Sequence, residues 1–196
     1  MRIISGKYGR RLFRVPHTFK ARPTTDMAKE NLFNILANQI DWEEIRALDL
    51  FAGTGSVGLE MLSRGARSVK AIEKDHAHAQ FIKGVVAELR DPNYTLQRND
   101  VLKYLKEMTD REIAEREQYD LVFADPPYQL RELPDLPQMI IQSGIIAPGG
   151  LLIVEHSKLN DFSHLPSFEE MRHYGSVHFS FFRPTIVVAD DQIDDN

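Results

Sequence analysis

The sequence predicts an α/β fold, a doubly wound, mostly parallel, seven-stranded Rossmann-like sheet, and three observations support this prediction. Short apolar runs typical of buried strands alternate with segments of helical periodicity, which is the pattern of parallel βαβ units. Residues 49–58 place a glycine-rich turn between a strand and a helix, where such sheets bind their ligands. Residues 168–189 contain two adjacent strands around Gly175-Ser176, and we expect them to form an antiparallel pair at one edge.

The predicted elements alternate along the chain after an N-terminal arm of short extended pieces, which could form a hairpin. A first helix is predicted after Pro23, because apolar residues from Ala28 to Leu36 recur at helical spacing. Strands are then predicted over residues 46–51, 68–73, 94–98, 119–124 and 151–155, the last of which follows a turn at 148–150. Helices are predicted over residues 56–64, from 75 to before 92, around 101–108 and around 139–146.

The bulk composition is that of a one-domain globular protein. The chain has 196 residues, of which 42% are apolar, and we expect a single domain with an arm over residues 1–22, a Rossmann-like core over 23–189 and an acidic tail over 190–196. It has no cysteine, no apolar run that approaches the roughly 18 residues of a membrane span, and no apolar stretch typical of a secretory signal. These features favour a cytoplasmic protein that does not bind membranes, and we expect a monomer.

Charge is distributed unevenly between the arm and the rest of the chain. The chain has 24 basic and 29 acidic residues, but its first 22 residues hold seven basic groups and no acid. A basic arm favours contact with a polyanion such as nucleic acid, because binding is decided by the local potential and not by the net charge. The arm could also be a solvated terminal segment, so charge alone leaves its function open. The candidate nucleic-acid contacts are Arg2, Lys7, Arg10, Arg11, Arg14 and Lys20.

The turn after the strand predicted over residues 46–51 has the features of a nucleotide-binding loop. Gly53, Gly55 and Gly58 let the backbone turn tightly and approach a ligand, and the helix start behind them offers free N–H groups to an anion. Glu73 ends the next strand 20 residues after Gly53, where a carboxylate can accept hydrogen bonds from ribose hydroxyls. The spacing suits S-adenosylmethionine, whose methionine carboxylate would be the anion, and equally a nicotinamide dinucleotide. This loop therefore leaves a methyltransferase and a nicotinamide oxidoreductase open.

The run Asp125-Pro126-Pro127-Tyr128 favours the methyltransferase. It follows the fourth of these strands, at the edge of the sheet where ligands bind, and its prolines make a stiff, extended loop with free carbonyls. An aromatic exocyclic amine is a poor nucleophile, and the Asp125 carboxylate and Pro126 carbonyl could accept its two N–H groups, localising the lone pair and stabilising the developing positive charge. Asp125 could also take the proton, and Tyr128 offers a face on which a base can stack. A nicotinamide enzyme has no evident use for this loop.

Motifs spread over nearly the whole chain resemble a known family. Residues 49–55 (DLFAGTG) and 125–128 (DPPY) resemble the class I amino-group methyltransferases. Residues 5–12 (SGKYGRRL), 22–26 (RPTTD), 30–34 (ENLFN), 174–175 (YG) and 179–182 (FSFF) narrow the resemblance to the bacterial RsmD-type methyltransferases, which methylate the N2 amine of a guanine in small-subunit ribosomal RNA. The first predicted helix departs from the family pattern, because Met27 and Lys29 stand where many relatives have a more arginine-rich stretch.

The resemblance implies a class I methyltransferase fold and roles for named residues. S-adenosylmethionine would be held by Gly53, Gly55 and Glu73, with Asp100 near its adenine, and guanine would be held by residues 125–128. The arm would hold phosphates of ribosomal RNA, either free or in an assembled 30S-type particle. The candidate cofactor residues are Arg22, Thr24, Asp49, Phe51, Ala52, Gly53, Thr54, Gly55, Glu73, Lys74, Asp100 and Val101, and the candidate catalytic residues are Asp125, Pro126, Pro127 and Tyr128.

Several alternatives remain open on the sequence. An amino methyltransferase could act on adenine in DNA or RNA, or on a protein glutamine amide, although the basic arm and an Asp at position 125 favour a nucleobase. The fold could also serve as a non-catalytic RNA-binding domain, against which the intact run 125–128 argues. No metal site is predicted, because His76 and His78 lie two residues apart near a helix start and point to different faces.

Overall fold

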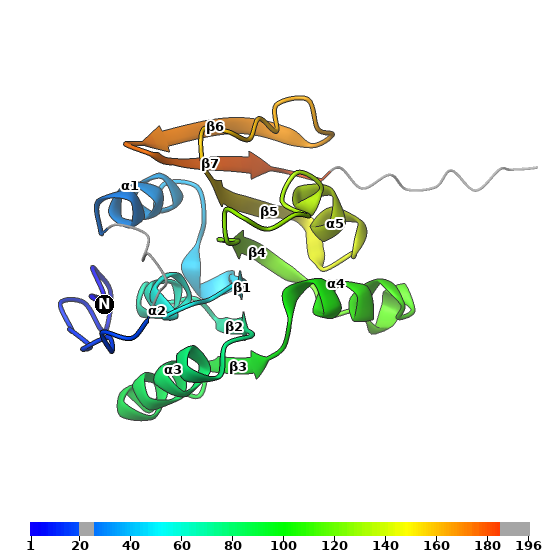
Figure 1. Ribbon diagram of the computed structural model, residues 1–196. Coiled ribbons are helices and arrows are strands. Elements are labelled where there is room, and N and C mark those ends of the chain that lie inside the picture. Colours follow the sequence, from blue (N-terminus) through cyan, green and yellow to red (C-terminus); the bar gives the residue numbers. More distant parts are fainter. Residues whose placement is uncertain (20–25, 185–196) are drawn as a thin grey trace, which may run out of the picture.

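The computed structural model describes residues 1–19 and 26–184 (Figure 1). Its strands are β1 (Arg46–Leu50), β2 (Ser68–Glu73), β3 (Tyr94–Arg98), β4 (Tyr119–Ala124), β5 (Ile146–His156), β6 (Phe168–Tyr174) and β7 (Val177–Phe182). Its α-helices are α1 (Asp26–Leu36), α2 (Ser56–Ser63), α3 (His76–Leu89), α4 (Val101–Thr109) and α5 (Leu136–Gln142), and short 3-10 turns lie at Trp42–Glu44 and Ile113–Glu115. The sequence predictions for Lys20, Arg22, Thr24 and the tail over 190–196 concern residues outside the described ranges.

The strands form one mixed sheet in the order β3-β2-β1-β4-β5-β7-β6. Neighbours from β3 to β5 pair in parallel, whereas β7 pairs antiparallel with both β5 and β6. The predicted doubly wound, seven-stranded sheet with an antiparallel edge pair is therefore confirmed. The order reverses direction between β1 and β4, and this switch point opens a crevice beyond the carboxyl ends of the parallel strands.

Helices cover both faces of the sheet. The helices α1, α2 and α3 lie on one side, and α4 and α5 lie on the other (Figure 1). The core on the first side includes Leu59 and Ile82, and the core on the second includes Leu105 and Ile140. Because β4 is covered on both faces, residues 121–124 form a continuous apolar run with no alternation between apolar and polar side chains.

The helix α5 lies earlier in the chain than predicted. The sequence predicts a helix around residues 139–146, but α5 begins at Leu136 and ends at Gln142. Pro137 occupies its first turn, where the missing N–H of proline costs no helical hydrogen bond. Gly144, with φ 70°, turns the chain away directly after the helix, so Ile146 belongs to the following strand.

The strand β5 is longer than predicted and contains a bulge. The segment 148–150 is predicted to be a turn before the strand, but it lies inside β5. Tyr119 is paired with Ile146 and Leu121 with Leu151, so the register shifts and the additional residues of β5 have no partners in β4. A proline without an N–H and a glycine with φ 74° suit a bulge as well as a turn, and the local sequence therefore does not distinguish the two.

The N-terminal arm packs on the body of the protein. Arg2 and Leu12 form an antiparallel bridge, which agrees with the predicted hairpin, and Ile3 and Phe13 are buried in the core beside α1 and α2. The N–H of Lys7 donates to the carbonyl oxygen of Ser63 in α2 (2.7 Å). The arm is therefore seated on the helix that follows the glycine loop.

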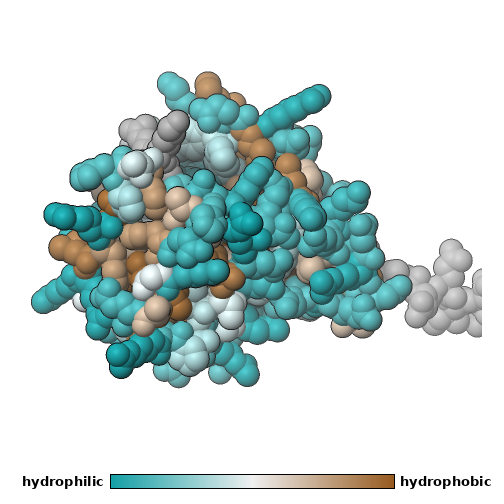
Figure 2. Space-filling model, turned by 60° about the horizontal axis from the view of Figure 1, so that its bottom comes forward, coloured by the Kyte–Doolittle hydropathy of each residue, from teal (hydrophilic) through white to brown (hydrophobic). Residues whose placement is uncertain are grey.

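The face of the molecule drawn in Figure 2 is mostly hydrophilic, and its apolar side chains gather in a few patches. Among the described residues no helix has the length and apolar character needed to cross a membrane.

Candidate active site

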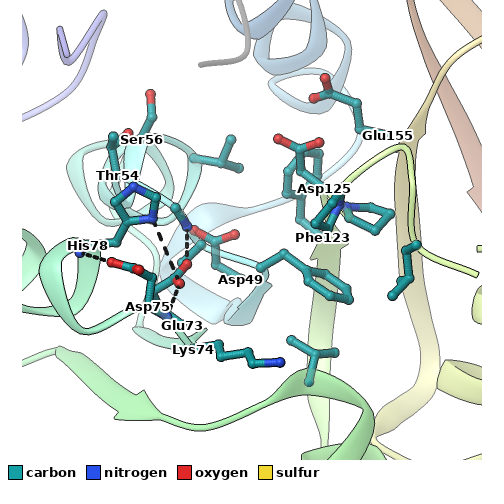
Figure 3. Close-up of a pocket in the computed structure, with 18 of the residues that line it drawn as sticks. Asp49, Thr54, Ser56, Glu73, Lys74, Asp75, His78, Phe123, Asp125 and Glu155 are labelled. Atoms are coloured by element: carbon teal, nitrogen blue, oxygen red, sulfur yellow. Dashed lines mark hydrogen bonds and ion pairs between the residues drawn. The ribbon is translucent and has the colours of Figure 1, made fainter. Parts of the chain in front are cut away.

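A pocket of about 970 Å³ lies at the carboxyl ends of β1, β2, β4 and β5 (Figure 3). The glycine loop and the run 125–128 both line it, although 70 residues separate them in the sequence. The pairing of β1 with β4 brings the two segments together, because Leu50 is paired with Ala124 and the N–H of Asp125 donates to the carbonyl oxygen of Leu50 (3.3 Å). The pocket is therefore bounded by both segments that the sequence identifies as chemically important.

The glycine loop approaches the pocket with its main chain exposed. Phe51, Gly53 and Gly55 all have positive φ angles, of 62°, 56° and 73°, which the tight turn after β1 requires. A Cβ atom at Gly58 would lie 2.8 Å from the Asp49 carboxylate, so the helix–strand contact itself needs glycine there. A Cβ atom at Gly53 would lie 3.9 Å from the nearest atom, so space beside this residue is open to a ligand.

Glu73 at the end of β2 fixes the loop. One carboxylate oxygen accepts from the N–H of Gly53 (2.6 Å) and the other from the N–H of Asp75 (2.6 Å), as Figure 3 shows. Each oxygen keeps a second lone pair, which can accept a hydroxyl hydrogen from a ligand. Glu73 therefore both shapes the loop and offers the acceptors that a ribose requires.

Asp49 is a buried carboxyl group beneath the loop. Its Oδ2 accepts from the N–H of Gly58 (2.9 Å). The pKa of Asp49 is raised to about 7, mainly by burial and to a smaller extent by the carboxylates of Asp125 and Glu73, while the hydrogen bond from Gly58 opposes this rise. Near neutral pH the group therefore stands between its two protonation states, and a cationic ligand group in the pocket would favour the ionised one.

The contribution of Asp49 to the free energy of unfolding is expected to fall as the pH rises from about 4 to 7. The folded protein holds the Asp49 proton up to a pKa of about 7, whereas the unfolded chain loses it near 3.8, so the native state binds more protons in this window. The effect is at most about 4 kcal/mol. The free energy of unfolding can be measured with urea at pH 5 and at pH 8. Between these two values it should decrease less for Asp49→Asn than for the unchanged protein. The amide oxygen of the variant can still accept from the N–H of Gly58. Parallel pH profiles of the two proteins would contradict this assignment.

Lys74 and Asp100 lie at the end of the pocket beside α4. They form an ion pair of 2.7 Å, and Asp100 also caps α4 by accepting from the N–H groups of Leu102 (3.0 Å) and Lys103 (3.3 Å). These contacts lower the pKa of Asp100, so it is a carboxylate at neutral pH. Val101 lines the pocket next to it, which makes this end a mixed apolar and acceptor surface suited to a planar heterocycle.

The run 125–128 presents its carboxylate and its aromatic ring to the pocket. Pro126 is buried, while the Tyr128 side chain lies at the pocket mouth and the residue is 43% exposed. The N–H of Leu130 donates to the carbonyl oxygen of Pro127 (2.8 Å), which folds the chain back after the two prolines. Tyr128 is therefore not part of the core, and its ring is accessible to a ligand.

The structure adds pocket residues that the sequence reasoning missed. Glu155 lies near the end of β5 and next to Asp125, because Val154 is paired with Ala124, and the two carboxylates are directed to the same side (Figure 3). It is only 3% exposed, although it lines the pocket. An acidic residue that ends a predicted buried strand was the available signal for it. The turn between β6 and β7 also contributes Ser176 and Val177, which no local pattern identifies.

The residues of the pocket fit S-adenosylmethionine. The open space beside Gly53, the carboxylate of Glu73 and the apolar and acceptor groups at Val101 and Asp100 match the needs of a nucleoside. The N-cap of α2 is Gly55, which has no side chain to cap the helix, and within the first turn the N–H of Gly58 donates to Asp49. The N–H groups ahead of Gly58 can therefore serve the methionine carboxylate.

The fold and the pocket define a class I, S-adenosylmethionine-dependent methyltransferase. The sequence model of the family described as Conserved hypothetical protein 95 matches residues 1–183, and the chain belongs to this family.

The relatives of the chain include ribosomal RNA small subunit methyltransferases D from several bacteria. The chain is 32% identical to that of Escherichia coli (strain K12) over 167 residues, which are 85% of this chain and 80% of the relative. It is 32% identical to that of Haemophilus influenzae over 160 residues, which are 81% and 79% of the two chains. The solved structure of a hypothetical protein from Thermus thermophilus matches with a TM-score of 0.80 and 29% identity, covering 94% of this chain and 99% of that one. The methyltransferase prediction is confirmed, and the nicotinamide oxidoreductase that the glycine loop left open is not supported.

Proposed function

We propose that the protein transfers a methyl group from S-adenosylmethionine to the exocyclic N2 amine of a guanine in small-subunit ribosomal RNA. The observation that carries the proposal is the position of residues 125–128 beside the glycine loop, in one pocket at one edge of the sheet. The names of the relatives, which act on small-subunit ribosomal RNA, support the substrate. We further propose that the protein acts as a monomer, on free RNA or on an assembled small-subunit particle.

Asp125 and Pro126 would activate the amine. Bound S-adenosylmethionine supplies an electrophilic methyl group on a sulfonium. The Asp125 carboxylate and the Pro126 carbonyl oxygen would accept the two amine hydrogens, so that the nitrogen lone pair leaves the ring system and the charge that develops on nitrogen is stabilised. Asp125 can then hold the released proton. Tyr128, at the pocket mouth, would stack on the base after it has turned out of the RNA.

Glu155 favours guanine over adenine in this pocket. Guanine carries a hydrogen on ring atom N1 next to its amine, whereas adenine has an unprotonated nitrogen next to its amine. A second carboxylate beside Asp125 accepts the N1 hydrogen of guanine and repels the lone pair of adenine. The paired carboxylates at the ends of β4 and β5 thus support the same substrate as the relatives' names.

The proposed function can be tested with labelled S-adenosylmethionine. The protein is incubated with undermethylated small-subunit particles, with free ribosomal RNA and with DNA, and the labelled nucleosides are identified after digestion. We expect label in N2-methylguanosine from the particles or the free RNA. Label in N6-methyladenosine, in DNA or in protein glutamine would replace the proposal with one of the alternatives.

The exposed part of the arm is proposed to bind RNA phosphates. Arg10, Arg11 and Arg14 are exposed, and no acidic partner for them is found among the described residues. Two other candidates are engaged, because Lys7 pairs with the buried Asp91 (2.6 Å) and Arg2 pairs with Asp26 (3.1 Å). The charges of Arg10, Arg11 and Arg14 are therefore less neutralised by the protein itself than those of Arg2 and Lys7, and they can attract RNA phosphates more strongly.

Replacing Arg10, Arg11 and Arg14 together with glutamine is expected to weaken RNA binding and to reduce its salt dependence. Each phosphate contact contributes about 0.7–0.9 to the slope of log K against log salt concentration, so three lost contacts reduce the slope by about 2–3. The affinity for RNA is measured over a series of salt concentrations, with Lys106→Gln on the distant end of α4 as a control. An unchanged slope would remove the arm from the RNA interface.

A further inference from the structure

Lys29 in α1 is a fully buried cation whose position none of the roles above explains. Its side chain is 0% exposed, and its ammonium group donates to the carbonyl oxygen of Arg2 (2.6 Å) and to Ser56 Oγ (2.8 Å). Burying an ammonium group is costly unless an opposite charge compensates it. Burial accordingly lowers the pKa of Lys29, and the carboxylate of Glu60 opposes this change.

Glu60 compensates the charge of Lys29 only in part. The nearest Glu60 oxygen lies 4.0 Å from Lys29 Nζ, beyond hydrogen-bond distance. The two Glu60 oxygens instead accept from the N–H groups of Ile4 (2.7 Å) and Ser5 (3.0 Å), and from Arg64 Nε (2.9 Å). Glu60 is closer to Arg64 than to Lys29, so it neutralises Arg64 first. The positive charge of Lys29 is therefore only partly neutralised, and it lies next to Ser56.

Ser56 connects this charge to the pocket. It is the first residue of α2 and lines the pocket together with Gly53 and Thr54 (Figure 3). Its Oγ accepts from Lys29, so its own hydroxyl hydrogen is available for a second partner. The uncapped N–H groups at the start of α2 and the helix dipole favour negative charge at the same place.

We propose that Lys29 is a positioning residue for the cofactor, which acts through Ser56 to stabilise the methionine carboxylate at the start of α2. The helix start, the hydroxyl donor and the buried ammonium group form one positive corner of the pocket. The inference rests on S-adenosylmethionine as the cofactor and not on RNA as the substrate, so it can fail while the proposed function stands. The bond from Lys29 to the carbonyl oxygen of Arg2 also attaches the arm at this corner.

The test compares two ligands that differ at the amino-acid end. S-adenosylhomocysteine carries the carboxylate, whereas 5′-methylthioadenosine lacks the whole amino-acid group, and both can be measured by calorimetry without methyl transfer. In Lys29→Met, which retains most of the side-chain volume, we expect the Kd of S-adenosylhomocysteine to rise about tenfold, because a charge-supported hydrogen bond is lost. The Kd of 5′-methylthioadenosine should change less than about twofold, since this ligand does not reach the corner. Lys29→Arg should restore most of the lost affinity.

A structural role of Lys29 gives a different result. If Lys29 only holds α1, α2 and the arm together, its loss weakens both ligands by the same factor, and this outcome would overturn the proposal, as would unchanged affinity for both. If Lys29→Met does not fold, Ser56→Ala decides the question, because it removes one hydroxyl at the pocket wall. We then expect a loss of about threefold for S-adenosylhomocysteine alone. Equal losses for both ligands would again count against the proposal.

Discussion

Asp125→Ala is expected to reduce kcat for RNA methylation by about 10²–10³-fold, because one of the two acceptors that hold the amine in the transition state is lost. The Kd for S-adenosylhomocysteine should stay within about twofold of the unchanged protein, since we assign the carboxylate to the base and not to the cofactor. Single-turnover methylation with saturating cofactor measures the first quantity, and calorimetry measures the second.

Asp125→Asn is the matched variant for this experiment. It keeps one acceptor oxygen and the size of the side chain but removes the charge, so its loss of kcat should be smaller than that of Asp125→Ala. Comparing the loss of kcat in the two variants separates the effect of the acceptor oxygen from the effect of side-chain size. Full turnover in Asp125→Ala would exclude the proposed role of the carboxylate.

Glu73→Ala is expected to raise the Kd for S-adenosylmethionine by about 100-fold or more. The variant removes the acceptors that we assign to the ribose hydroxyls, and it also releases the N–H groups of Gly53 and Asp75, so the loop loses its fixed shape. Hydrogen bonds to a charged group contribute about 1.5–3 kcal/mol each, and two such bonds account for the expected factor. Equilibrium dialysis or calorimetry measures the affinity.

Lys74→Ala is the matched variant for this experiment, because Lys74 is also a cofactor candidate on the sequence but its ammonium group is paired with Asp100 in the structure. Lys74 follows Glu73 directly, but its side chain is 77% exposed and its ammonium group faces Asp100. We expect this substitution to change the affinity less than about threefold, because exposed ion pairs contribute little. A cofactor affinity of Glu73→Ala equal to that of Lys74→Ala would show that Glu73 does not bind the ribose.

The sequence predicted the bounds of three strands correctly, for reasons that differ between the buried strand β4 and the edge strand β3. The strands β2, β3 and β4 begin and end at the predicted residues. In β4 a continuous apolar run leaves few alternatives. The limits of β3 instead follow from the turn residues Pro92 and Asn93 before it and from Asp100, which caps the next helix. The prediction failed at residues 148–150, where a proline and two glycines are compatible with either a turn or a bulge. Only the pairing of β5 with β4 decides between these, and that pairing is a long-range contact.

The candidate site was predictable as two motifs but not as a complete pocket. The glycine loop and residues 125–128 each carry a local signal, because their backbone conformations require glycine or proline. Glu155 carries only the signal of an acidic residue that ends a predicted buried strand, and the turn at Ser176 carries none, since both reach the pocket through strand order and the antiparallel return of β7.

The sequence by itself determined the fold class, the methyltransferase class and the two loops that line the pocket, because periodicity and the backbone demands of glycine and proline are local properties. Only the tertiary structure decided which basic side chains are engaged inside the protein and which are exposed to a ligand. It places Lys7 against Asp91 and Lys29 behind Ser56, and leaves Arg10 exposed. The physical reason is that the effect of a charge depends on its burial and on partners that are distant along the chain, and neither can be read from neighbouring residues.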